Sequence, residues 1–129
     1  MKILLDTNFL VYCAKQKIDY IEEIDRIFDF KYEIIILSNV IKELEELAGK
    51  KDKDSNNALL SLAVLSKNIE ENKISKIEAE EKRPDKSFEK ISEKEKVVVA
   101  TMDKELKEKL KKMDTKILSI RGAKTLKIL

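Results

Sequence analysis

The chain has 129 residues, a length typical of one domain, and 40% of them are charged although the formal net charge is only +2. Net charge alone therefore does not indicate a nucleic-acid partner. The sequence has no histidine and a single cysteine, Cys13. This composition excludes a histidine general base, a Ser-His-Asp triad, a zinc site built on imidazole or thiolate ligands, and an intramolecular disulfide, so any bound metal must have oxygen ligands.

The elements predicted from hydrophobic periodicity alternate between apolar strands and amphipathic helices. In chain order they are a strand at 2–6, a helix at 18–30, a strand at 32–37, helices at 40–48 and 55–71, a strand at 74–79, a helix at 85–94, a strand at 97–101, a helix at 103–113 and a strand at 115–120. Continuous apolar strands between such helices predict a parallel sheet covered on both faces. We therefore expect residues 1–129 to form one three-layer α/β/α domain with a mainly parallel central sheet of about five strands.

Local signals refine these boundaries. Gly49 is expected to cap the end of a helix before an exposed loop at 49–57, and Pro84 to open the next helix. The alternating tail AKTLKIL after Gly122 is expected to add a short edge strand. The first apolar stretch is interrupted by Asp6, which is unlike a secretory signal, and no apolar run approaches the ~20 residues of a membrane span. We predict a cytoplasmic protein with Cys13 as a core residue.

Four acidic residues fall where strands end or helices begin. Asp6 closes the first strand, Glu43 lies early in the helix after 32–37, Asp85 follows Pro84, and Asp103 follows the strand at 97–101. In an open α/β sheet, the carboxyl ends of strands and the amino ends of the following helices share one edge, where active sites form. The spacing thus predicts an acidic site at this edge.

Each acid also has a purely structural interpretation. Asp85 and Asp103 are well placed as helix N-caps, which contribute about 1 kcal/mol each. Glu43 lies at the border of its helix's apolar face and suits a solvated flank. Together they favour a metal site, because two like charges about 4 Å apart repel by roughly 4 kcal/mol at an effective dielectric of 20. A divalent cation, Mg²⁺ or Mn²⁺, would relieve this repulsion, and no EF-hand loop for Ca²⁺ is present.

Three segments resemble the motifs of the PIN-domain nuclease family. LLDTN (4–8) is similar to its first strand and aspartate, SNVIKELEEL (38–47) to its second motif, and VVVATMDKEL (97–106) to its fourth. The likeness runs from residue 2 to about 120, and is greater to archaeal PIN proteins related to the nucleases of small-subunit rRNA processing than to VapC toxins. It implies a metal-dependent endoribonuclease.

The same resemblance implies roles for particular residues. Asp6, Glu43 and Asp103 would bind the metal, and Thr101, with Thr7 or Asn8, would orient the site. The third acidic motif departs from the family pattern. RPDKSFEKI offers Asp85 alone, with Lys86 where a second acid often stands, which would weaken a second metal site and catalysis.

The mechanism expected from these residues is in-line hydrolysis of RNA by water activated at one or two metal ions. Basic residues that could contact phosphates are Lys104, Lys107, Lys111, Arg121, Lys124 and Lys127, although a solvated face explains the first three at least as well. Among the aromatic residues, Tyr12, Phe9 and Tyr20 could stack on bases, with core packing the simpler assignment for Phe9 and Tyr12.

Two other functions stay open. One is a VapC-type toxin ribonuclease controlled by an antitoxin. The other is a catalytically weak PIN domain that binds RNA or assembles on pre-ribosomes. The resemblance is also compatible with a homodimer. A generic nucleotide-binding domain is disfavoured, because with only Gly49 and Gly122 the chain has neither a P-loop nor a dinucleotide fingerprint.

Overall fold

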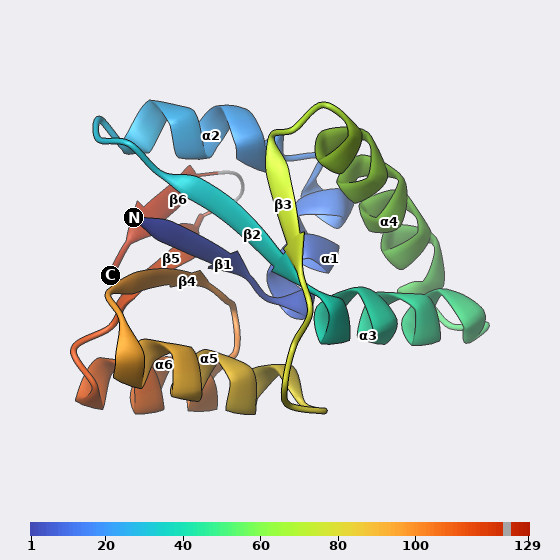
Figure 1. The fold of residues 1–129 in the computed structure, drawn as a ribbon. Coiled ribbons are helices and arrows are strands. Elements are labelled where there is room, and N and C mark those ends of the chain that lie inside the picture. Colours follow the sequence, from blue (N-terminus) through green and yellow to red (C-terminus); the bar gives the residue numbers. More distant parts are fainter. Residues whose placement is uncertain (123–124) are drawn as a thin grey trace.

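The central sheet runs through the whole computed structural model, which describes residues 1–122 and 125–129. Within these residues the strands are β1 (Lys2–Leu5), β2 (Glu33–Leu37), β3 (Ile74–Ile77), β4 (Val97–Ala100), β5 (Lys116–Arg121) and β6 (Thr125–Ile128). Their order is β3-β2-β1-β4-β5-β6 (Figure 1). The first five are parallel, and β6 runs antiparallel to β5. The predicted tail strand is thus β6, a sixth strand, and the start of that tail, 123–124, lies outside the described residues.

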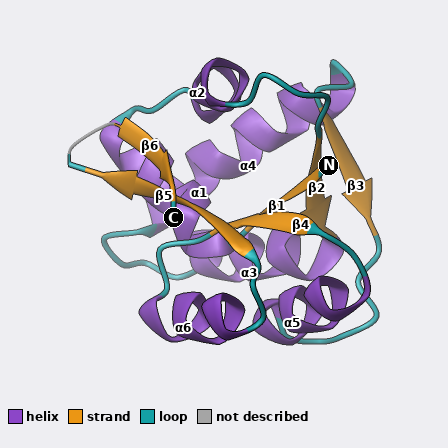
Figure 2. Cartoon of the chain, turned by 90° about the vertical axis from the view of Figure 1, so that its left-hand side faces the viewer, coloured by secondary structure: helices purple, strands orange, loops and turns teal. Residues whose placement is uncertain are grey.

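The helices cover both faces of this sheet, as predicted. They are α1 (Thr7–Gln16), α2 (Tyr20–Ile27), α3 (Ser38–Gly49), α4 (Ser55–Glu70), α5 (Pro84–Lys94) and α6 (Lys104–Lys112). Helices α5 and α6 lie together on one face, while α1, α2 and α4 lie on the other (Figure 2). Strand β4 is buried along its whole length between these layers. No helix within the described part of the chain is long and apolar enough to cross a membrane.

Helix α1 is the one element that periodicity failed to predict. Its sequence TNFLVYCAKQ is apolar at six successive positions, 9–14, so it shows no amphipathic pattern. In the structure, Phe9, Leu10 and Cys13 pack into the core, which confirms the prediction for Cys13. Val11 and Tyr12 lie on a second face, which lines a pocket. The helix therefore looks uniformly apolar in sequence because both of its faces are used.

The boundaries of other elements shift by a few residues. Pro84 opens α5 as predicted. Gly49 is instead the last residue of α3, and the C-cap residue is Lys50 with φ −81°, so no left-handed glycine caps the helix. Helix α3 also begins at Ser38, two residues earlier than predicted, which places Glu43 in its second turn.

The strand order places a crevice at the centre of the sheet. From β1 the chain moves outward to β2 and β3, then crosses to β4 and β5 on the other side of β1. In open α/β sheets, ligands bind at such a switch point, beyond the carboxyl ends of the strands. Asp6 follows β1 and Thr101 follows β4, and these strands pair in parallel up to Leu5 and Ala100.

Candidate active site

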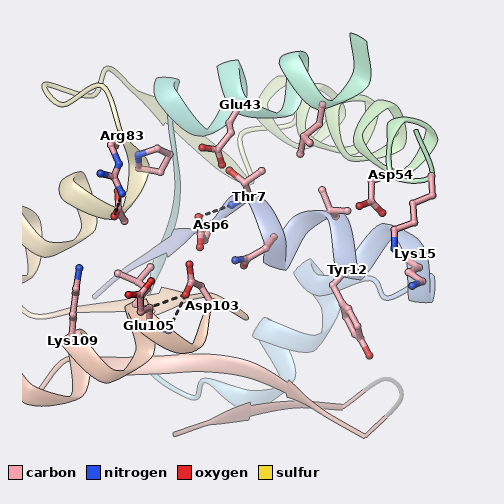
Figure 3. Close-up of a pocket in the computed structure, with 17 residues that line it drawn as sticks. Asp6, Thr7, Tyr12, Lys15, Glu43, Asp54, Arg83, Asp103, Glu105 and Lys109 are labelled. Carbon is pink, nitrogen blue, oxygen red and sulfur yellow. Dashed lines mark hydrogen bonds and ion pairs between the residues drawn. The ribbon is translucent and has the colours of Figure 1, made fainter. Parts of the chain in front are cut away.

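A pocket of about 570 Å³ opens at the carboxyl ends of β1 and β4. All four predicted acids, Asp6, Glu43, Asp85 and Asp103, are part of its wall, and Figure 3 shows Asp6, Glu43 and Asp103 there. They come from the β1–α1 turn, α3, α5 and the residue before α6, so segments far apart in sequence meet at the predicted edge. Thr101 lies behind this wall and is fully buried.

Asp6 is the best-anchored acid of the pocket. The residue is only 7% exposed, and its side chain caps α1 by accepting a hydrogen bond from the Thr7 amide at 2.8 Å. Its other carboxylate oxygen accepts a hydrogen bond from the Thr101 hydroxyl at 2.7 Å. The Asp6 amide donates to the Ala100 carbonyl at 2.9 Å, which holds this turn against β4. Asp6 forms no ion pair with any described residue.

The charge of Asp6 is unfavourable where it lies. Burial raises the pKa of its carboxyl to about 6, the hydrogen bonds from Thr101 and Thr7 oppose this rise, and the charges of Glu43 and Asp103 add to it. A carboxylate is normally ionised well below this pH. The pocket thus holds negative charge that a bound cation would stabilise.

Thr101 connects Asp6 to Asp103. Its hydroxyl donates to Asp6 and accepts a hydrogen bond from the Asp103 amide at 3.1 Å. Asp103 caps α6, as its structural interpretation predicted, because its Oδ1 accepts from the amides of Glu105 and Leu106 at 2.9 and 3.2 Å. Its Oδ2 accepts no hydrogen bond from the described residues, so capping leaves one oxygen available to a ligand.

The two candidate orienting residues after Asp6 have different surroundings. Asn8 lines the pocket, and its side-chain oxygen accepts from the Met102 amide at 3.0 Å, joining the turns after β1 and β4. The Thr7 hydroxyl is buried beside the pocket and has no hydrogen-bond partner in the described part of the chain. Unpaired buried hydroxyls are unusual in folded proteins, and active sites are one place where they occur.

Asp85 lies at the same pocket but is held differently. Arg83 forms an ion pair with it at 2.8 Å, so an arginine already offsets the charge of one of the four acids. Lys86 does not line the pocket, and its ammonium group lies 3.7 Å from Glu89 instead. The cation that pairs with Asp85 is therefore Arg83, whereas Lys86 lies beside Glu89.

Two residues missed in the sequence hold the segment before Asp85 and the start of α5. The amide of Asn39 donates to the Glu81 carbonyl and to the Ser87 hydroxyl, both at 3.0 Å. The Ser38 hydroxyl accepts from the Ala79 amide at 2.9 Å. Polar residues directly after a buried strand were the available signal, since Ser38 and Asn39 follow β2 as Asp6 follows β1.

The oxygen donors of the pocket suit a hard divalent cation such as Mg²⁺ or Mn²⁺. The carboxyl of Asp6, poorly compensated in its buried position, is the clearest sign of this fit. As they stand, however, no three acidic side chains among the described residues are close enough together to share one ion. Binding would therefore require side chains such as Asp85 to turn toward Asp6.

The cations around the pocket differ from those predicted. Lys104, Lys107 and Lys111 are absent from its wall, and Lys107 donates to the Ser119 hydroxyl at 2.8 Å. The described cations that line the pocket are Lys15, Lys53, Arg83 and Lys109. Arg121 and Lys127 are exposed near β6, and Lys124 lies outside the described residues. Of the three candidate stacking residues, Phe9 and Tyr20 are buried in the core, whereas Tyr12 lines the pocket.

Comparisons with known proteins agree with this architecture. A family model described as a PIN like domain matches residues 3–123. The chain is 38% identical over 128 residues to Ribonuclease VapC4 of Methanocaldococcus jannaschii, covering 98% of this chain and 95% of that protein. It resembles the structure of the PIN domain endonuclease Utp24 with a TM-score of 0.79 and 26% identity, covering 98% of this chain and 90% of that one. A domain of a functionally unknown Methanocaldococcus jannaschii protein has the same fold, with a TM-score of 0.66, 19% identity and coverage of 95% and 93%.

Proposed function

This chain belongs to the PIN-domain nuclease family, and we propose that it is a metal-dependent endoribonuclease that hydrolyses RNA phosphodiester bonds in its acidic pocket. The observation that carries the proposal is the state of Asp6. Its carboxyl is buried near Glu43 and Asp103, and the pKa of Asp6 is raised to about 6. Perturbed carboxyls in a cleft are typical of functional sites. The names of the similar proteins, a ribonuclease and an endonuclease, support the same activity.

Mg²⁺ or Mn²⁺ would be held by Asp6, Glu43 and Asp103, with Asp85 as the fourth acid. When bound, such an ion supplies Lewis acidity, which lowers the pKa of water and offsets negative charge on the phosphate. This chemistry suits a chain without histidine, since no imidazole base is required.

The chain's own residues would position these groups. Thr101 fixes the direction of the Asp6 carboxylate through its 2.7 Å hydrogen bond. Asn8 keeps the turns after β1 and β4 in register through the Met102 amide. The cations on the wall of the pocket would contact RNA phosphates, a contact that fixes position without reading sequence.

A cleavage assay with matched variants tests the proposal. A labelled RNA should be cut by the wild-type protein only when Mg²⁺ or Mn²⁺ is added, and Asp6→Ala should lower the rate by about 100-fold or more, since even partners of metal ligands contribute 10–100-fold. Circular dichroism would show that the variant is folded. Exposed Glu45→Ala, on the solvent side of α3, is the control and should cut normally. Equal cleavage by Asp6→Ala, or cleavage in EDTA, would overturn the proposal.

The biological role that we propose is rRNA processing or RNA quality control in the cytoplasm, as the sequence resemblance predicts. The identity to a ribonuclease named VapC4 favours a toxin-type nuclease as second candidate, with a protein antitoxin as partner. A neighbouring gene whose product inhibits cleavage would favour the toxin, and co-purification with pre-ribosomes the processing role. Gel filtration would test the predicted homodimer.

A weakly catalytic RNA-binding module is the third candidate, and the Arg83–Asp85 ion pair favours it by occupying one acid. Tight RNA binding without metal-stimulated cutting would identify the module. Cutting at a rate that follows metal concentration would exclude it.

A further inference from the structure

We infer that one end of the pocket is a nucleotide subsite, in which a nucleobase stacks on Tyr12 and the adjoining phosphate contacts Lys15 and Lys53. This inference rests on the proposed function, because it assigns where RNA beside the cut phosphodiester is held.

One face of α1 extends from the acids to the proposed subsite. Asn8, Val11, Tyr12 and Lys15 all line the pocket, and their spacing of three or four residues puts them along one side of the helix. Asp6 caps the start of this helix. At 1.5 Å per residue, Tyr12 is about 9 Å from Asp6 along the helix axis. A nucleotide on Tyr12 would therefore lie beside, and not on, the acidic centre (Figure 3).

Tyr12 differs from the other aromatic residues that the structure describes. Phe9, Phe88, Tyr20 and Phe28 are buried in the core, while Phe30 and Tyr32 pack against Phe28. Tyr12 is half-buried, has no aromatic partner among the described residues, and is the one aromatic residue on the described wall of this pocket. An aromatic ring open to a polar pocket can stack on any base, since every base has a π face.

The cations near Tyr12 are available to a phosphate. Lys15, from α1, and Lys53, from the segment before α4, are exposed at the pocket, and neither forms an ion pair with a described residue. The cations of the pocket that come from the α5 and α6 side are already engaged: Arg83 pairs with Asp85 at 2.8 Å, and Lys109 lies 3.9 Å from Glu89. Apart from the four central acids, the Tyr12 end of the pocket has one acidic residue, Asp54, and two lysines, Lys15 and Lys53.

The experiment pairs protein variants with RNA variants. Short fluorescein-labelled single-stranded RNAs, each with one abasic position, are titrated in EDTA with the wild-type protein, Tyr12→Phe and Tyr12→Ala, and binding is followed by anisotropy. Tyr12→Ala should weaken binding of intact RNA by about 5- to 150-fold, the range for one stacked base, while Tyr12→Phe, which keeps the ring, should bind like the wild type. At one position only, the abasic RNA should abolish the difference between Tyr12→Ala and the wild type.

The lysines are tested by the dependence of binding on salt. Lys15→Ala and Lys53→Ala should each lower the slope of log affinity against log salt concentration by about 0.7, the value for one phosphate contact of a single strand. Lys51→Ala is the control, because Lys51 is exposed in the same segment but absent from the wall of the pocket. An equal loss with Lys51→Ala would assign the effect to general surface charge and overturn the phosphate contact.

The results separate the subsite from the proposed function. If the wild-type protein cuts RNA but no abasic position removes the difference in binding between Tyr12→Ala and the wild type, the subsite is wrong and the nuclease stands. If one abasic position does remove this difference but metal never stimulates cutting, the nuclease is wrong and the subsite stands. A uniform loss of binding by Tyr12→Ala for every RNA would indicate a structural effect and overturn the stacking assignment.

Discussion

The two sides of the acidic pocket are built in different ways. On the β1–β4 side, Asp6 is buried and held by the Thr101 hydroxyl and the Thr7 amide at 2.7 and 2.8 Å. On the α5 side, Asp85 is held by Arg83, whose side chain is 70% exposed. The first side depends on partners that the central strands fix in place. The second depends on a surface ion pair, which water and salt weaken.

This difference indicates a division of roles within the pocket. Buried hydrogen bonds keep Asp6 in one orientation, and the helix-capping bonds to its Oδ1 hold the exposed Asp103, before any ligand arrives. This is the preorganisation that metal sites and catalysis require. An exposed ion pair contributes about 1 kcal/mol or less, so Asp85 can exchange Arg83 for another cation at little cost. We therefore expect the β1–β4 side to define the site and the α5 side to adjust to the ligand.

The largest effect should come from neutralising Asp6. Below about pH 4 its carboxyl is protonated in both the folded and the unfolded chain. As pH rises, the unfolded chain loses this proton first, so folding stability falls by up to about 3 kcal/mol by the time pH exceeds the folded pKa of about 6. Asp6→Asn removes the charge, and urea denaturation without metal should show it to be more stable than the wild type at pH 7. An equal gain in folding stability at pH 4 would contradict the assignment of this effect to the buried charge of Asp6.

The next largest effect should come from the link between Asp6 and Asp103. Thr101→Val keeps the shape of the side chain but removes the donor to Asp6 and the acceptor for the Asp103 amide. Affinity for Mn²⁺, measured by electron paramagnetic resonance, and the cleavage rate should fall by about 10- to 100-fold. Thr101→Ser restores the hydroxyl and should recover most of both. If Thr101→Val matched the wild type, the β1–β4 side would not be preorganised by this residue.

The smallest effect should come from the α5 side. Arg83→Gln releases Asp85 from its ion pair and should strengthen Mn²⁺ binding by less than about 5-fold, because exposed pairs contribute so little. Arg83→Lys keeps the charge and should stay closer to the wild type. Weaker Mn²⁺ binding by Arg83→Gln would mean that Arg83 supports the site, and the comparison between the two sides would need revision.

Much of the fold could be predicted from periodicity. The predicted strands and five of the helices appear within a few residues of their expected bounds. Helix α1 was missed because Phe9 and Cys13 face the core while Val11 and Tyr12 face the pocket, which leaves no polar face to reveal the period. The same run of apolar residues made the position of Tyr12 unpredictable, since an apolar sequence context cannot distinguish the wall of a pocket from the core.

The sequence by itself determined the chemistry that is available: no histidine, one buried cysteine, and acids at the ends of strands, where parallel pairing brings them to one edge. Which cation each acid meets was decided only by the tertiary structure. Arg83 and not Lys86 reaches Asp85, and Lys109 and not Lys107 reaches the pocket. The reason is that strand order follows from hydrophobic burial over many residues, whereas the direction of a long charged side chain depends on neighbours from distant segments.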